Sequence, residues 1–169
     1  MTIIAVIFKT MKGYFMENIK YVYILSGISA RKLSDAEVER NFEIFQKEFG
    51  INHKLTFEYY QTFIKDFYKH PIDISISRED IAYFYDEKTA IDRAKHNIAD
   101  YNDGGINNYA MIERLPVNRA YPVTCSDLKY IYFKYNGRTG GYSEIKPSED
   151  EMVKYIDKKY NLFSPFDGD

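Results

Sequence analysis

The residues best suited to grip another molecule lie in an aromatic ribbon, KYIYFKY, at positions 129–135. Successive side chains of a strand point to opposite faces of the sheet. The alternation therefore predicts two faces: Tyr130, Tyr132 and Lys134 on one, and Ile131, Phe133 and Tyr135 on the other. If the Ile/Phe face packs on the core, the two tyrosines and the lysine point outward, and Arg138 stands at the tip of the next turn.

A surface of this kind would suit a macromolecular partner. Tyrosine and arginine dominate binding hot spots because they bring a large contact area at a low entropic cost, and tyrosines can also stack on unpaired bases. We predict that Tyr130, Tyr132, Lys134 and Arg138 contact a protein or a protein–nucleic acid complex, with direct binding of nucleic acid as a further option. The competing interpretation is that the sheet is covered on both faces and the tyrosines are core residues.

His96 is the candidate for catalysis. It lies between Asp92 and Asp100 at helical spacing, and two carboxylates beside an imidazole can set up a general base. Arginines suit phosphate recognition, and those that could join the histidine are Arg93, Arg114 and Arg119. This gives an alternative function, a metal-independent enzyme that acts on nucleic acid or a nucleotide. The same spacing is also typical of a solvated charge ladder.

Other chemistry finds little support in the residue patterns. The three histidines lack the spacing of a metal-binding pair. The glycine-rich turn 137–141 lies inside a predicted hairpin and lacks the Gly-Lys-Ser/Thr of a phosphate loop. Cys125 is the only cysteine, which excludes an internal disulfide and fits a reducing cytosol. We therefore predict no metal, no cofactor and no catalytic set of residues.

Periodicity and capping signals predict four helices. Ser34 and Glu37 form a capping box in front of a helix over 35–49. The short connection to the next helix predicts an antiparallel pair. The other helices are expected at 56–69, 87–101 and, after a capping box at Ser148 and Glu151, 149–160.

Alternating β-branched and aromatic residues predict five or six strands. These are expected at 19–25, 72–76, 81–85, 109–112, 129–135 and 141–145, with Ser26-Gly27 closing the first. Strands that cluster in hairpin-like pairs favour an α+β fold with an antiparallel or mixed sheet of about five strands. The helical pair 35–69 would be an insertion that covers one face of this sheet, within a single domain of 169 residues.

Charge and composition narrow the partner classes. The net charge of −2 is too small for long-range attraction to nucleic acid or an acidic membrane surface. The apolar run at residues 3–8 is too short to span a bilayer, which needs roughly 20 residues. The chain is rich in residues with AT-rich codons, including 17 tyrosines and 12 phenylalanines, as in the genomes of low-GC bacteria, their phages and their plasmids.

The two ends of the chain stand apart from the predicted domain. Lys12-Gly13 can be encoded by a purine-rich ribosome-binding sequence just before Met16. We therefore expect Met16 as the natural start and residues 1–15 as translated leader, with a true strand at residues 3–8 as the alternative. Residues 162–169 are expected to form a loose acidic tail.

These observations favour a small cytosolic, non-enzymatic binding protein. The AT-rich coding sequence suggests a phage- or plasmid-borne inhibitor of a host defence system, of the anti-CRISPR or anti-restriction type, which would act by occluding or remodelling a macromolecular partner. No membrane association is expected.

Overall fold

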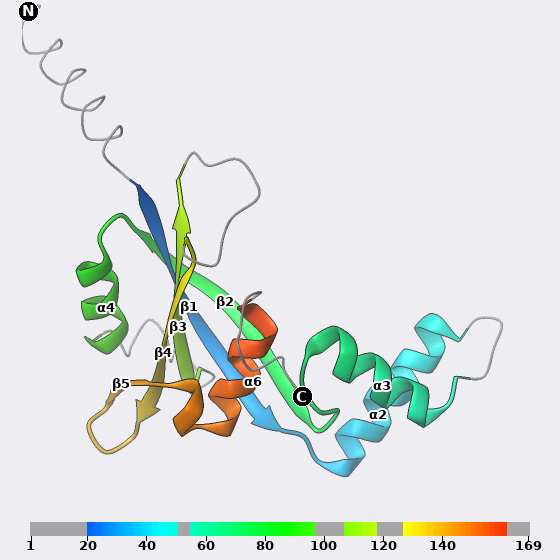
Figure 1. Ribbon diagram of the computed structural model, residues 1–169. Coiled ribbons are helices and arrows are strands. Elements are labelled where there is room, and N and C mark those ends of the chain that lie inside the picture. The colour runs from blue at the N-terminus through cyan, green and yellow to red at the C-terminus, as the bar shows by residue number, and fades with distance from the viewer. Residues whose placement is uncertain (1–19, 51–54, 97–106, 118–126, 162–169) are drawn as a thin grey trace, which may run out of the picture.

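The fold is organised around a five-stranded antiparallel sheet with strand order β2-β1-β3-β4-β5 (Figure 1). The computed structural model describes residues 20–50, 55–96, 107–117 and 127–161. The strands are β1 (Tyr21–Lys32), β2 (Ile74–Phe84), β3 (Tyr109–Pro116), β4 (Lys129–Asn136) and β5 (Gly141–Ile145). Together with the helices, this sheet confirms the predicted α+β fold.

A helix covers each face of the sheet. Figure 1 shows α4 (Glu87–His96) on one face and α6 (Glu151–Tyr160) on the other. On the α4 face, Ala90 and Ala94 are fully buried, and their small side chains let the helix lie close to Phe133. On the α6 face, the helix contributes Val153 and Ile156 to a second apolar cluster. The described sheet therefore lies between two separate cores.

Strand β1 is longer than predicted, because Ser26-Gly27 does not end it. The Ser26 hydroxyl donates to Asp80 Oδ1 at 2.7 Å and satisfies a fully buried polar group. A Cβ on Gly27 would lie 2.5 Å from Asn107 Nδ2. The glycine therefore makes room for a crossing side chain, and its predicted role as a strand end is wrong.

Strand β2 joins two segments that were expected to be separate strands, 72–76 and 81–85. The charged residues between them remain in the ladder. Leu25 of β1 pairs with Ala82, whereas Ser26 pairs with Asp80, so Ile81 is an extra residue at a β-bulge. The bulge reverses the in–out alternation, which is why the sequence pattern looked like a break.

Helices α2 (Asp35–Phe49) and α3 (Phe57–Tyr68) form the inserted pair, within one residue of the expected bounds. The insertion joins β1 to β2 and extends past the end of these strands instead of covering a sheet face (Figure 1). The prediction that the pair covers the sheet is therefore wrong. The reason is topological: the sheet already has α4 and α6 on its faces, and the pair occupies the turn of a β-hairpin.

The two helices of the pair meet through aromatic rings. Phe42 contacts Phe57, Phe45 contacts Tyr60, and Phe49 contacts Phe63, with ring centroids 5.1–6.3 Å apart. The partners ascend together along both helices, whereas antiparallel neighbours would pair in reverse order. The helices therefore cross, and the predicted antiparallel pairing is wrong.

The last helix begins two residues later than predicted, with Asp150 and not Ser148 as its N-cap. A short 3₁₀ helix, η1 (Pro147–Glu149), comes first, and Asp150 then caps α6 by accepting from the backbone N–H groups of Met152 and Val153. Several predictions lie outside the described residues: the leader 1–15 with Met16, Cys125, Asp100, Arg119, the end of the helix predicted at 87–101, and the tail 162–169.

Candidate functional site

The predicted binding face of β4 turns inward, onto α6. Tyr132 is 4% exposed, and its hydroxyl donates to Asp157 Oδ1 at 2.5 Å. The half-buried Tyr130 donates to Glu113 Oε1 at 3.0 Å. Burial, reinforced by these carboxylates, raises the pKa of both hydroxyls above their ordinary value. The expectation that the two tyrosines point freely outward is therefore wrong.

Lys134 and Arg138, unlike the two tyrosines, are exposed to solvent. The Lys134 ammonium forms an ion pair of 2.6 Å with Asp150, the residue that caps α6. Arg138 is exposed at the tip of the β4–β5 turn. The Ile/Phe side of the ribbon does face the core, as predicted, with Phe133 at 0% exposure. The opposite side was predicted wrongly, because α6 packs there: Asp157 of α6 accepts from Tyr132, and the capping residue Asp150 pairs with Lys134.

Of the histidine–arginine cluster in the alternative function, the described residues bring together only His96 and Arg93, one turn apart on α4, whereas Arg114 lies elsewhere. His96 is exposed in the last turn of α4, where its Nδ1 lies 2.8 Å from the backbone oxygen of Asp92. Arg114 lies near the opposite end of α4, with its guanidinium 4.4 Å from the ring centroid of Tyr21. It is paired across the sheet with Lys129, and Lys129 forms an ion pair with Glu87 in the first turn of α4. A ten-residue helix is about 15 Å long. Among the described residues, His, Cys, Asp and Glu also form no group of three that could hold a metal ion.

Of the eight large hydrophobic side chains exposed in the described part of the chain, six lie on α2 and α3, which we call the aromatic helical pair. Phe67 is 69% exposed, Phe49 62% and Tyr59 53%. The other large apolar side chains exposed on the pair are Ile44, Phe57 and Tyr68. Taking roughly 200 Å² for each such side chain, the exposed fractions amount to on the order of 600 Å². Contiguous apolar patches of this size lie at the upper end of what monomers carry, and such patches are often interaction sites.

This surface is also strongly acidic. Helix α2 carries five acidic and two basic residues and α3 carries two acidic and one basic, so the pair has a net charge of −4. The whole chain has a net charge of −2. Negative charge is therefore concentrated on the pair, and most of it lies on exposed side chains.

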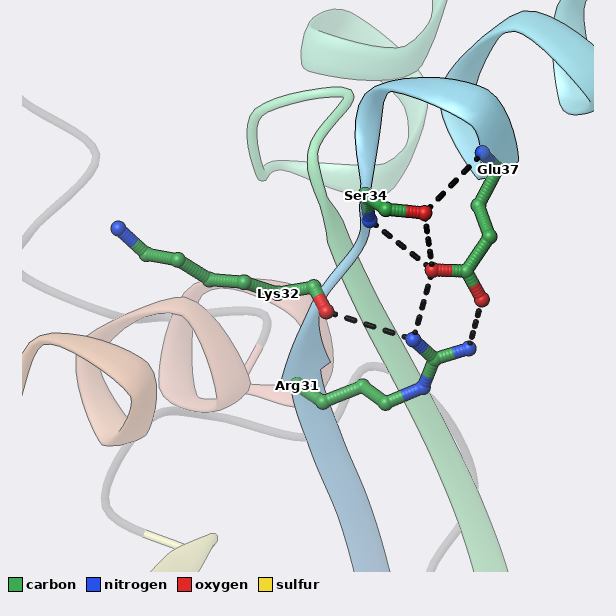
Figure 2. A network of polar contacts seen from close by, with 4 residues as sticks. All are labelled: Arg31, Lys32, Ser34 and Glu37. Carbon is green, nitrogen blue, oxygen red and sulfur yellow. Dashed lines mark hydrogen bonds and ion pairs between the residues drawn. The ribbon is translucent and has the colours of Figure 1, made fainter.

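A polar joint fixes how α2 leaves the sheet (Figure 2). Both guanidinium nitrogens of Arg31, at the end of β1, donate to the Glu37 carboxylate at 2.6 and 3.1 Å. The same carboxylate accepts from the backbone N–H and the hydroxyl of Ser34 at 2.9 and 3.0 Å. The hydrogen bonds from Arg31, followed by those from Ser34, lower the pKa of Glu37 to about 2. The capping box thus also ties the helix to the strand.

A second joint holds the end of α3. Lys159 of α6 places its ammonium 5.4 Å from the ring centroid of Tyr68 and donates to the backbone oxygen of Ile76 at 2.7 Å. His70 follows the helix in a buried position, where burial, assisted by the charge of Lys159, lowers the pKa of its imidazole. Strand β2 starts four residues later, directly paired with Lys32 of β1. The pair therefore projects from the sheet on two anchored connections.

Helical periodicity places Phe49 and Phe67 on the apolar stripes of α2 and α3, but a pair of two helices is too thin to cover both side chains. The signal that could have identified the surface is the width of the apolar arc on α3. Phe57, Tyr59 and Tyr68 lie outside the stripe of Tyr60, Phe63, Ile64 and Phe67, so about half of the helix circumference is apolar. A single partner helix cannot cover an arc of that width.

Comparison with known proteins adds no family. No family model, no curated protein and no solved structure matches the chain. In the part of the chain that is described, no helix is both long and apolar enough to cross a membrane.

Proposed function

We propose that this protein is a non-enzymatic binding protein that docks its aromatic helical pair on a basic surface of a protein partner. The observation that carries the proposal is the exposure of Phe49, Tyr59 and Phe67 on an anchored, acidic projection. Exposed aromatic side chains supply hot-spot contact area, and their acidic surroundings favour a partner of opposite charge.

The charge of the pair also supports a protein partner over bare nucleic acid. A surface with a net charge of −4 repels phosphates. The same repulsion would oppose the pairing of two copies through this surface. A basic groove of a protein, including one that normally holds nucleic acid in a protein–nucleic acid complex, supplies the opposite charge.

Inhibition follows naturally from this mode of binding, since an acidic aromatic projection would occlude the basic surface that it occupies. We retain the proposal of a phage- or plasmid-borne inhibitor of a host defence system, acting in the cytosol. Its support is the AT-rich codon composition together with this route to occlusion. The tyrosines of β4 have no part in the proposal.

The test is an affinity purification with the full chain from a lysate of the source organism, followed by mass spectrometry. Phe49→Ala/Tyr59→Ala/Phe67→Ala removes rings from the pair, and Glu39→Lys/Glu43→Lys reverses two exposed charges of α2. Tyr83→Ala/Tyr85→Ala is the matched control, because these tyrosines are 63% and 65% exposed but lie at the end of β2 and just beyond it.

Capture of a protein is not sufficient support. We expect a stoichiometric partner with a basic surface that both helical-pair variants lose and the control keeps, and retention that weakens as salt is raised. A partner retained equally by all variants would contradict the proposal. So would a partner lost only from the control, or light scattering that shows a dimer of this chain broken by the triple variant.

A further inference from the structure

The sheet has two different kinds of open edge. The outer edge of β2 is long, but it carries the charged run Arg78-Glu79-Asp80 and the bulge at Ile81. Charges and bulges are devices that block the addition of another strand. On the opposite side of the sheet the edge strand is β5, which has only five residues. The start of β4 is open beyond it, because the β4–β5 ladder begins only at Tyr132 paired with Ile145.

The register shows which backbone groups are open there. The backbone N–H of Tyr135 donates to the backbone oxygen of Asn108, the residue before β3, at 3.0 Å. The backbone groups of the odd-numbered residues of β4 therefore point toward β3. The backbone N–H and C=O groups of the even-numbered residues of β4 then point toward β5. Tyr130 lies two residues before Tyr132, where the pairing of β4 with β5 begins. If the same register continued, Pro147 would lie opposite Tyr130, but β5 has ended before that residue. The N–H and C=O of Tyr130 therefore face outward with no strand partner in the described part of the chain.

A groove of about 450 Å³ lies against this edge. Its lining on the α4 side includes Ile91 and Ile131, and on the α6 side Tyr130, Asp157 and Asn161. Glu144, exposed on β5, also lines the groove. The open backbone thus lines a groove whose α4 side combines Ile91 and Ile131 with the ion pair of Glu87 and Lys129, and whose α6 side carries hydrogen-bonding groups.

We propose that an extended segment of a partner protein adds to β4 at this groove as a further strand, in line with β5. Its backbone would bond to the N–H and C=O of Tyr130, which is the mode of β-augmentation. Side chains beside Tyr130 would point to the α6 wall, and their sequence neighbours to the α4 wall.

The walls specify the chemistry of the segment. Side chains toward α4 meet Ile91 and Ile131, which favour one β-branched or leucine residue. The side chain toward α6 meets the hydroxyl oxygen of Tyr130, whose proton goes to Glu113, and this oxygen favours a hydroxyl or ammonium donor. The segment therefore alternates an apolar residue with a serine, threonine or lysine. This site shares no residue with the aromatic helical pair and does not depend on the function proposed above.

The probe is a pool of synthetic eight-residue peptides in which valine, isoleucine or leucine alternates with lysine, serine or threonine, added to the isotope-labelled full chain. A pool of the same composition with the apolar residues grouped together is the peptide control. We expect the alternating pool to slow exchange of the Tyr130 amide proton by about tenfold or more. The amides of the aromatic helical pair should not respond.

Glu144→Trp places a bulky ring over the groove from an exposed position, and Ser143→Trp is its matched control on the opposite face of β5. The first should weaken binding of the best peptide by about tenfold or more, and the second should change it less than about threefold. Absence of amide protection at Tyr130, equal response to the grouped pool, or equal binding by both tryptophan variants would overturn the proposal.

Discussion

The sheet and the aromatic helical pair use the same residue types in opposite ways. In the sheet, Phe133 is fully buried beneath α4, and Tyr132 is sealed under α6 with its hydroxyl on Asp157. In the pair, Phe67 is 69% and Tyr59 53% exposed. Both regions are rich in aromatic residues. Their surroundings differ because the sheet has a helix on each face, whereas in the described part of the chain the exposed side of the pair is not covered by a further helix.

This contrast shows that aromatic content does not mark a binding surface. An aromatic strand in the middle of a sheet contributes to stability when both faces are covered, as in β4. An aromatic helix with an apolar arc wider than one neighbour can cover leaves contact area for a partner, as in α3. Mutations of the same type in the two regions should therefore separate stability from binding.

The largest expected difference comes from one substitution made in both regions. Phe133→Ala leaves a cavity in the α4 core and should lower the free energy of unfolding by about 3–5 kcal/mol. Phe67→Ala removes a mostly exposed ring and should cost less than about 1 kcal/mol. Urea denaturation followed by circular dichroism measures both. Equal losses would show that Phe67 is a core residue and would remove the distinction.

A second pair of substitutions removes one hydroxyl from each region. Tyr132→Phe takes away a hydrogen bond to the buried Asp157 carboxylate and should cost about 1–3 kcal/mol. Tyr59→Phe removes an exposed hydroxyl and should stay within about 0.5 kcal/mol of the parent protein. Denaturation midpoints at neutral pH decide the matter, and a neutral Tyr132→Phe would show that α6 is not held by this contact.

A substitution in the connection after α3 is expected to raise the stability of the protein. Lys69 follows the helix with φ = 61°, in the left-handed region that glycine adopts without strain. Lys69→Gly should therefore raise the stability of the chain by about 0.5–1 kcal/mol. A rise in the thermal midpoint with unchanged helix content checks this. A fall would mean that the lysine makes a contact worth more than the backbone strain.

The smallest effect is expected at the joint between β1 and α2. Because the folded pKa of Glu37 is about 2, below its ordinary value of 4.5, its stabilising contribution is present above pH 4.5 and is lost as the pH falls toward 2. The stability difference between the parent chain and Glu37→Gln should therefore shrink between pH 4.5 and pH 2. Denaturation curves of both proteins across this range test the joint, and a constant difference would contradict it.

Local signals in the sequence predicted most of the elements. The capping box at Ser34 and Glu37 placed α2 correctly, and the alternation over residues 129–135 placed β4 correctly. Two predictions were wrong: β2 was expected as two strands because of the bulge at Ile81, and β1 was expected to end at Gly27. Both depend on a neighbouring strand or side chain that is distant in sequence, and no local pattern encodes such a neighbour.

The candidate site was harder to predict than the fold. Whether Tyr132 is exposed depends on where α6 packs, and α6 begins only at Glu151. Whether Phe49 is buried depends on how α2 and α3 cross, because crossing helices share only a short contact. Periodicity identifies an apolar face but does not say whether anything covers it.

The most direct test of the binding role is the affinity of the purified partner for the chain, measured by titration calorimetry. For Phe49→Ala/Tyr59→Ala/Phe67→Ala we expect a dissociation constant raised by about 100-fold or more, as hot-spot rings of 2 kcal/mol or more require. For Tyr83→Ala/Tyr85→Ala we expect a change of less than about threefold. A triple variant that binds within about threefold of the parent chain would contradict the role of the aromatic helical pair.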